Sequence, residues 1–251
     1  MTDKTSLGDR MKAYEKCYNF SLPRRTHVIL RLDGKSFHTW TRGLSKPYDE
    51  DLWRVFCETT IDLVKHIQNV QFAYFQSDEI SIYMNDFATI RTEPWFGNEL
   101  QKLVSVSASV CTAHFNKSAR SLPSFEEKPL AYFDSRAFVL PEQAEVFNYV
   151  YWRFKDCMRN SIMSAGQHYF SQKQLHKKNT SEVKEMLFQE CGIKWSKDFP
   201  DWNKNGSLCF RSPDGPSIIP CPNLLEQEGK AFLADLIPAH LPYEVSNYGN
   251  V

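Results

Sequence analysis

Apolar residues recur with two different spacings along the chain, and they predict a mixture of strands and helices. Short runs rich in β-forming residues indicate four strands, Thr26–Leu32, Phe72–Phe75, Ile80–Met84 and Tyr132–Leu140. Two stripes at helical spacing predict helices that pack one face on a sheet, from Leu52 to Ile67 and from Leu100 to Phe115. The resulting order, β-α-β-β-α-β, predicts a split β-α-β, ferredoxin-type antiparallel sheet with helices on one face.

The segments on either side of this unit predict further helices. Ser6–Asn19 has the spacing of a short amphipathic helix, Pro141 begins a long helix, and Leu224–Ile237 fits a final one. Periodicity is weaker after Gly192. We therefore expect an α/β (α+β) protein that forms a single compact unit over residues 1–251, with a sheet domain at about 24–140 and a helical extension at about 141–251.

The overall charge of the chain excludes few classes of function. The chain has 30 basic and 30 acidic residues, so no global field marks it as a nucleic-acid-binding protein. Any basic surface must come from local segregation of charge. Such segregation occurs between Tyr151 and Lys178, where a single acid, Asp156, is outnumbered by Arg153, Lys155, Arg159, Lys173, Lys177, Lys178, His168 and His176. This segment is suited to binding an RNA phosphate backbone, and a solvated helix face is the alternative.

The spacing of the cysteines and the residues at the amino terminus indicate the cellular compartment. The seven cysteines are scattered without metal-binding or disulfide spacing, which predicts small buried side chains in a reducing compartment. The amino terminus lacks an apolar leader, and no apolar run approaches the roughly 20 residues that span a bilayer. We expect a cytoplasmic protein with no membrane association.

Acidic residues follow two of the predicted strands. Asp33 comes directly after the first strand, and Asp78 lies with Glu79 between the second and third. These strands are neighbours in a split β-α-β sheet, so the topology should bring Asp33 and Asp78 together. A buried carboxylate is costly unless its charge is compensated, and Mg²⁺ needs only one or two protein carboxylates. We interpret the pair as a Mg²⁺ site for phosphoryl or nucleotidyl transfer, in an arrangement that polymerase palms and nucleotide cyclases share.

Residues near the acids are candidates for contacting a nucleoside triphosphate. Gly34 supplies backbone freedom for a close approach to a ligand. Phosphate oxygens could be bound by Ser36, Phe37 and His38, through amides or side chains, and by Lys35, Lys46 and Lys102. Taken singly, an Asp-Gly pair or a Ser-Asp-Glu turn is also common in ordinary loops. Structural positions are expected for His27, His114, Trp53 and Trp152.

Four spaced motifs resemble those of the tRNA-His guanylyltransferase family, the 3′-to-5′ nucleotide polymerases. They are Arg31–His38, Gln76–Glu79, Tyr132–Arg136 and Trp152-Arg153-x-x-Asp156-x-x-x-Asn160, and the similarity runs from about Leu7 to about Phe210. The resemblance implies a palm at about 24–140, an RNA-binding extension at about 141–251, two Mg²⁺ ions, a homotetramer and a tRNA substrate. It also implies that ATP or GTP activates the RNA 5′-phosphate, which the 3′-hydroxyl of an incoming nucleotide then attacks.

Roles follow from the resemblance residue by residue. The metal ligands would be Asp33, Asp78 and the carbonyl of Gly34, and Glu79 beside them would complete the catalytic set. Nucleotide contacts are expected at Gly34, Lys35, Ser36, Phe37, His38, Lys46, Asp49, Ser77 and Lys102. RNA contacts are expected at Arg136, Arg153, Arg159, Asn160, Lys173, His176, Lys177 and Lys178.

Two departures from the eukaryotic pattern narrow the expected activity. The eukaryotic His-Ile-Asn-Asn is replaced by Met158–Ser161, and Glu99 stands where those members have an arginine. Both differences resemble the bacterial and archaeal branch, which implies template-dependent repair of truncated tRNA 5′ ends, with other nucleotides besides GTP and ATP as substrates. Two alternatives remain open, a non-catalytic palm that binds nucleotide or RNA, and a cyclase-type palm enzyme.

Overall fold

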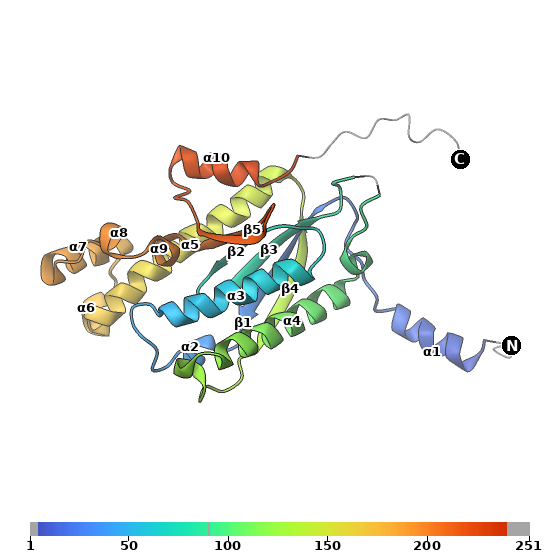
Figure 1. The fold of residues 1–251 in the computed structure, drawn as a ribbon, viewed down its shortest axis with the longest axis horizontal. Helices are drawn as coiled ribbons and strands as arrows, with labels where there is room; N and C mark the ends of the chain where they lie inside the picture. The colour runs from blue at the N-terminus through green and yellow to red at the C-terminus, as the bar shows by residue number, and fades with distance from the viewer. Residues whose placement is uncertain (1–4, 90, 240–251) are drawn as a thin grey trace.

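Six strands form one sheet in the order β4-β1-β3-β2-β5-β6, and every neighbouring pair is antiparallel (Figure 1). The computed structural model describes residues 5–89 and 91–239. The strands are β1 (His27–Gly34), β2 (Val70–Gln76), β3 (Glu79–Asn85), β4 (Phe133–Leu140), β5 (Ser207–Ser212) and β6 (Gly215–Pro220). The first four confirm the predicted split β-α-β order, and the last two extend the sheet beyond β2.

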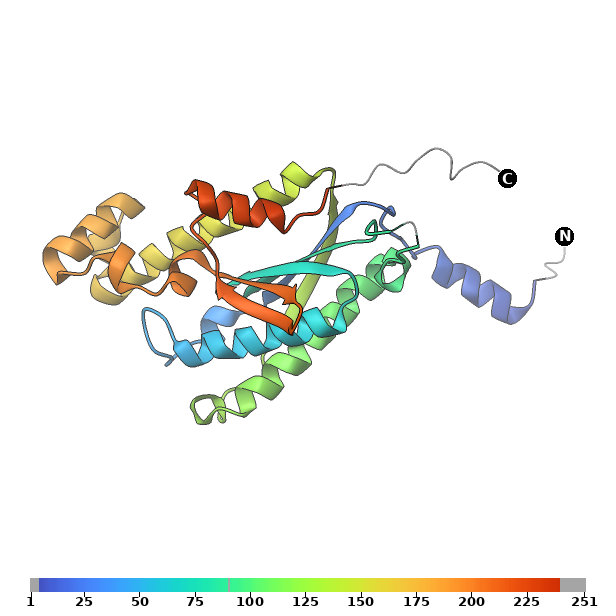
Figure 2. The ribbon, with the colours of Figure 1, turned by 45° about the horizontal axis from the view of Figure 1, so that its top comes forward.

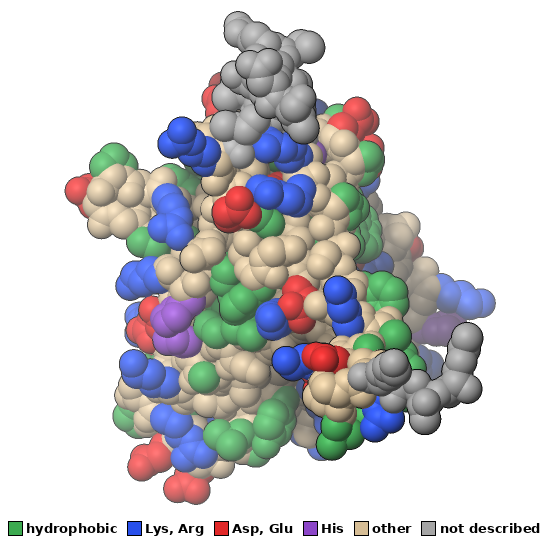
Figure 3. Space-filling model, turned by 90° about the vertical axis from the view of Figure 1, so that its right-hand side faces the viewer, with side chains coloured by type: hydrophobic (Ala, Val, Ile, Leu, Met, Phe, Trp, Pro, Cys, Tyr) green, Lys and Arg blue, Asp and Glu red, His purple; other side chains and the backbone are tan. Residues whose placement is uncertain are grey.

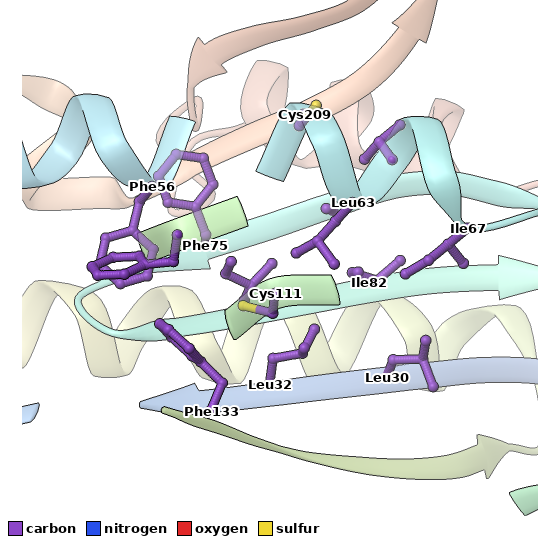
Figure 4. Packing of buried hydrophobic residues seen from close by; sticks show 14 of the residues in the cluster. Leu30, Leu32, Phe56, Leu63, Ile67, Phe75, Ile82, Cys111, Phe133 and Cys209 are labelled. Atoms are coloured by element: carbon purple, nitrogen blue, oxygen red, sulfur yellow. The ribbon is translucent and has the colours of Figure 1, made fainter. Parts of the chain in front are cut away.

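Two crossover helices cover one face of the sheet, as predicted. They are α3 (Glu50–His66) and α4 (Leu100–Arg120), and they pack on alternate residues of the strands, such as Leu30 and Leu32 of β1 and Ile82 of β3 (Figure 4). Short helices close the ends of this layer, namely α2 (Phe37–Trp40), η1 (Trp95–Asn98) and η2 (Pro123–Phe125). Because side chains alternate between the two faces of a strand, the intervening residues point the other way.

The second face is covered by the carboxyl-terminal part of the chain. The long helix α5 (Gln143–Tyr169) and α10 (Gln227–Asp235) pack there against Ile29, Phe72 and Tyr83 (Figure 2). The extension is thus not wholly helical, since it returns to the sheet as β5 and β6. Their weak strand pattern has a simple cause. Each of the two strands has only six residues. In addition, β6 contains Pro216 and Pro220, and proline is tolerated there because β6 is an edge strand.

Beyond the end of the sheet, α5 continues into a small helical cluster. It comprises α6 (Gln172–Leu175), α7 (Thr180–Cys191), α8 (Trp195–Asp198) and α9 (Asp201–Asn205). These helices bury a separate apolar cluster around Val183, Leu187 and Trp195. The segment after α9 leads directly into β5, so this cluster is fixed to the sheet at both of its ends.

At the opposite end of the molecule, α1 (Leu7–Lys16) stands apart from the body and buries none of its residues (Figures 1 and 2). On this end, Lys, Arg, Asp and Glu side chains lie interspersed among hydrophobic ones (Figure 3). Four cysteines are buried as expected, whereas Cys17 and Cys191 are exposed. Among the described residues, no helix is long and apolar enough to cross a membrane.

Candidate active site

The two candidate acids meet at one end of the sheet. Asp33 lies near the end of β1, and Asp78 lies in the two-residue turn between β2 and β3. β1 pairs with β3 so that Asp33 is opposite Glu79. The amide of Gly34 donates to the carbonyl of Asp78 at 3.1 Å, which closes the gap between strand end and turn. The structure therefore brings together the two carboxylates that the topology predicts to be neighbours.

Electrostatics at this acid pair favour a cation. Burial raises the pKa of Asp78, and the negative charge of Asp33 raises that pKa further. A hydroxyl hydrogen bond from Ser77 to Oδ1, at 3.0 Å, opposes the rise. Asp33 is 31% exposed, and its nearest cation is Arg31, with a nitrogen 3.4 Å from its carboxylate. Two adjacent carboxylates in this setting fit a hard divalent cation such as Mg²⁺.

A Mg²⁺ ion would depend on few protein ligands here. In residues 5–89 and 91–239, no three His, Cys, Asp or Glu side chains form a metal-binding group. The protein's own contribution would then be Asp33, Asp78 and the carbonyl of Gly34. This donor set suits an ion whose remaining positions are filled by water and phosphate oxygens.

Glu79 has a different environment from its neighbour. Its side chain is buried and accepts a bidentate pair of hydrogen bonds from Arg153, at 2.7 and 2.8 Å, and Arg31 lies 2.5 Å away. Burial raises the pKa of Glu79 and both guanidinium groups lower it. Because arginines engage both of its oxygens, Glu79 holds Arg153 of α5 and Arg31 of β1 in place. It therefore does not join the acid pair of Asp33 and Asp78.

The same pairing corrects the expectation that Arg153 contacts RNA. Only 5% of Arg153 is exposed, and its guanidinium group is shared between Glu79 and Asp156. A guanidinium that is buried and bonded in this way cannot reach a phosphate outside the protein. The basic run of the sequence thus contains one arginine that is internal.

The loop after β1 exposes backbone groups, whereas its aromatic side chain, Phe37, is buried. A Cβ on Gly34 would lie 2.3 Å from Cδ2 of Phe37, so only glycine allows this ring to pack here. Phe37 is buried against Phe56, Phe115 and Phe133, which leaves its amide as the only group that could face a nucleotide. The exposed positions of the loop are Lys35, Ser36 and His38.

Ser36 and Ser77 both have positive φ, at 53° and 51°. Such a conformation is uncommon outside glycine, and it is often retained where a loop faces a ligand. Both turns that carry the acids therefore contain a residue in this uncommon conformation.

A pocket of about 220 Å³ adjoins this end of the sheet. One wall is the segment Lys46–Asp49, the floor includes Gln76 and Ser77, and the facing wall comes from α5 and α9. Of the predicted nucleotide contacts, Lys46, Asp49 and Ser77 line it, together with the predicted RNA contact Asn160. The pocket is also lined by residues that were not predicted, because no local pattern links α5 and α9 to its other walls, namely Ser161, Ser164, Trp202 and Asn203.

Aromatic stacking and capping hold the pocket walls. Trp53, which was expected in the core, stacks on Trp202 with ring centroids 5.0 Å apart, and Tyr48 meets Trp202 edge-on at 5.3 Å. Asp49 accepts hydrogen bonds from the amides of Leu52 and Ser45, at 2.9 and 3.0 Å. The carboxylate of Asp49 thus caps α3 and ties down the pocket loop.

Lys102 does not belong to this site. It lies in the first turn of α4 and pairs with Glu99 at 2.8 Å. The same helix reaches the end of the sheet near the acids at Thr112, whose hydroxyl accepts from the amide of Phe133, opposite Gly34. Ten helical residues separate the two positions, a distance of about 15 Å. A triphosphate bound at the acids therefore cannot contact Lys102 of the same chain, and the prediction of this contact is wrong for a single chain.

The remaining predicted RNA contacts lie on the surface. Arg136 is exposed on β4, and Arg159 is exposed on α5, where it pairs with Asp156. Exposed positions in and after α6 are taken by Lys173, His176, Lys177 and Lys178. Lys178 also pairs with Glu182 at 3.0 Å. These residues could meet an RNA without rearrangement of the interior.

A split β-α-β sheet with two carboxylates at one end and an adjoining pocket is the arrangement of palm-type nucleotidyltransferases. The chain belongs to the tRNAHis guanylyltransferase family, whose sequence profile matches residues 8–141.

Comparisons with individual proteins agree. The fold matches a bacterial tRNA(His) guanylyltransferase-like protein in complex with ATP, with a TM-score of 0.86 and 41% identity, covering 93% of this chain and 99% of that one. It also matches such a bacterial protein in complex with GTP, with a TM-score of 0.77 and 37% identity, covering 92% and 99%. The tRNA(His) guanylyltransferase of Saccharomyces cerevisiae is 29% identical over 203 residues, which are 74% of this chain and 82% of that protein.

Proposed function

We propose that this protein is a nucleotidyltransferase that adds nucleotides to the 5′ end of tRNA in the 3′-to-5′ direction. The observation that carries the proposal is the acid pair Asp33 and Asp78 beside a pocket lined by Lys46 and Ser77. Family membership supports it, as do the ATP and GTP complexes of similar bacterial proteins.

The proposed reaction has two steps. An oxygen of the RNA 5′-phosphate attacks the α-phosphorus of ATP or GTP and displaces pyrophosphate. The 3′-hydroxyl of an incoming nucleoside triphosphate then attacks the activated 5′-phosphorus, loses its proton and displaces the mononucleotide. When bound at Asp33 and Asp78, Mg²⁺ would supply charge neutralisation for phosphate oxygens.

The chain's own groups have distinct tasks in this proposal. Lys46 and Ser77 bind the triphosphate from the pocket side, and the amides of Ser36, Phe37 and His38 bind it from the strand side. Glu79 fixes Arg31 and Arg153 and thereby keeps the acids in register. We further propose two Mg²⁺ ions, a homotetramer, a cytoplasmic location and repair of truncated 5′ ends as the natural task.

A 5′-extension assay tests the proposal. A 5′-monophosphorylated tRNA that lacks its first nucleotide is incubated with Mg²⁺ and each nucleoside triphosphate in turn. We expect extension by the wild-type protein and at least a thousandfold loss with Asp33→Asn or Asp78→Asn, since both remove a metal ligand. Asp214→Asn, an exposed carboxylate in the turn between β5 and β6, is the matched control and should be fully active.

Other outcomes of this assay would indicate a different function. Extension by both acid variants at the wild-type rate would refute the proposal. Consumption of a nucleoside triphosphate without RNA would indicate a cyclase-type enzyme. Binding of both ligands without product, for every tRNA tried, would indicate a non-catalytic palm.

A further inference from the structure

One large aromatic residue near the acids is on the surface and not in the core. Trp152 is 54% exposed, although a structural position was predicted for it. Its ring is nevertheless fixed on the protein side. Tyr149 meets it edge-on with centroids 6.0 Å apart, and the guanidinium carbon of Arg153 lies 4.5 Å from the ring centroid.

The two residues that hold Trp152 also reach the acid end of the sheet. The hydroxyl of Tyr149 is 2.9 Å from that of Ser81, and Arg153 is bonded to Glu79. Trp152 is thus supported by the same network that positions the acids. An aromatic ring with one immobilised face and one free face is ready to stack without further ordering.

Neighbouring contacts place Trp152 on the β4 side of α5. Tyr149 also packs edge-on against Phe138 of β4, at 5.6 Å. Arg136 is two residues from Phe138 and so shares its face of the strand, and its side chain is 62% exposed. Because β4 is an edge strand, no further strand covers this side of the sheet within the described chain.

The charges around Trp152 indicate what it meets. Lys155 and Arg159 follow it by three and seven residues on α5, and both are exposed, whereas the acid four residues after it, Asp156, is paired with Arg153 and Arg159. The ammonium group of Lys155 lies 5.7 Å from the ring centroid of Tyr151. The core of a protein interface is depleted in charge, whereas single-stranded nucleic acid is bound by aromatic rings between cationic side chains. The surroundings therefore favour a nucleic-acid base over a protein partner.

The base of the incoming nucleotide is not the candidate. The pocket beside the acids is lined from α5 by Cys157, Asn160, Ser161 and Ser164, and Trp152 is not among its residues. A nucleoside in that pocket would lie on the other side of α5.

We infer that Trp152 is a stacking platform for a base at or next to the 5′ end of the RNA substrate. This inference rests on the proposed function and specifies how the RNA end is held. Stacking would fix the terminal nucleotide at the β4 side of the acids while the triphosphate enters from the pocket side.

The test compares Trp152→Ala with Trp152→Phe in the 5′-extension assay. We expect Trp152→Ala to raise the KM for RNA about tenfold or more, with the KM for the nucleoside triphosphate unchanged. Trp152→Phe should restore most of the affinity because it keeps a stacking face. Phe188→Ala removes a similarly exposed aromatic from α7 and is the control that should leave both constants unchanged.

A second readout does not require turnover. RNA carrying 2-aminopurine at its 5′-terminal position should lose fluorescence on binding to the wild-type protein and not on binding to Trp152→Ala. If the wild-type protein fails to extend RNA, the proposed function fails while this quenching still tests the stacking. An unchanged KM for RNA in Trp152→Ala, an equal loss in Trp152→Phe, or a change of oligomeric state in Trp152→Ala would overturn the inference.

Discussion

The adjacent carboxylates Asp78 and Glu79 have different roles because their neighbours differ. Glu79 faces two guanidinium groups, whereas Asp78 faces another acid, Asp33. The first arrangement fixes structure, and the second leaves negative charge for a ligand to neutralise. Substitutions at the two positions should therefore have opposite effects on stability.

Glu79→Ala should lower the free energy of unfolding by about 3–5 kcal/mol, because it leaves buried Arg153 without its carboxylate partner. Urea unfolding at pH 7 measures this change. Asp33→Ala, at a partly exposed carboxylate, is the comparison and should unfold close to the wild-type midpoint. Equal midpoints for Glu79→Ala and the wild-type protein would contradict this role.

Asp78→Asn should stabilise the metal-free protein at neutral pH. The raised pKa means that the folded protein holds the proton more tightly than the unfolded chain does. The ionised carboxylate therefore costs stability, and this cost grows as the pH rises above the unfolded-state value of about 4. Thermal unfolding of both proteins should show a higher Tm for the variant at pH 7 and similar values below about pH 4.

The reverse order at pH 7 would mean that another group compensates the charge of Asp78. Added Mg²⁺ provides a further check, since a ligand that binds only the folded state raises its Tm. The ion should raise the Tm of the wild-type protein and leave that of Asp78→Asn nearly unchanged.

Asp33 and Asp78 were predictable from the sequence, whereas the partners of Glu79 were not. A strand end followed by an acid is a local signal, and topology then joins two such signals. The pairing of Glu79 with Arg153 spans 74 positions in the sequence, and nothing in the basic run distinguishes an internal arginine from exposed ones. For the same reason the exposure of Trp152 was unforeseen.

At the scale of elements, the beginning of α3 also shapes the pocket. Asp49→Ala should destabilise the protein by about 0.5–2 kcal/mol, because the amides of Leu52 and Ser45 lose their acceptor. Asp49→Asn should retain the stability, since asparagine caps equally well. Chemical unfolding measures both variants, and a loss in Asp49→Asn equal to that in Asp49→Ala would show that the charge, and not the cap, matters.

The end of β1 depends on a missing side chain. Gly34→Ala should cost about 1–3 kcal/mol and reduce extension activity, because the new methyl group would displace the ring of Phe37. Gly8→Ala is the matched control, since no atom lies within 4 Å of its added Cβ. Wild-type stability and activity in Gly34→Ala would show that the loop adapts without cost.

Elements with long stripes were predicted well, and short ones were not. Repeated apolar positions over several turns identify α3, α4 and α5. The strands β5 and β6 lack such repetition, and their pairing is decided by the open edge of β2 and by the apolar face that Leu208 completes. That decision belongs to tertiary packing and not to local sequence.

At the scale of the whole molecule, the two ends of the chain contribute unequally. Removal of α1, so that the chain begins at Cys17, should change the free energy of unfolding by less than about 1 kcal/mol, because none of its residues is buried. Circular dichroism and urea unfolding measure the effect. Removal of residues 207–237 is the contrasting truncation, and it should abolish folding because it strips Leu208, Leu224 and Leu233 from the core. Cooperative unfolding of that truncated chain would contradict this division.

The pairing of β2 with β5 also sets the order in which the site can be completed during synthesis. The indole of Trp53 donates to the hydroxyl of Ser207 at 3.1 Å, across 154 positions of the chain. Both acids leave the ribosome long before the pocket wall that faces them. Contacts this distant in sequence form slowly, and the uncovered edge of β2 is meanwhile free to pair with other chains. Nucleotide binding should thus begin only when the last third of the protein has been made, which makes early chain termination harmful to solubility as well as to activity.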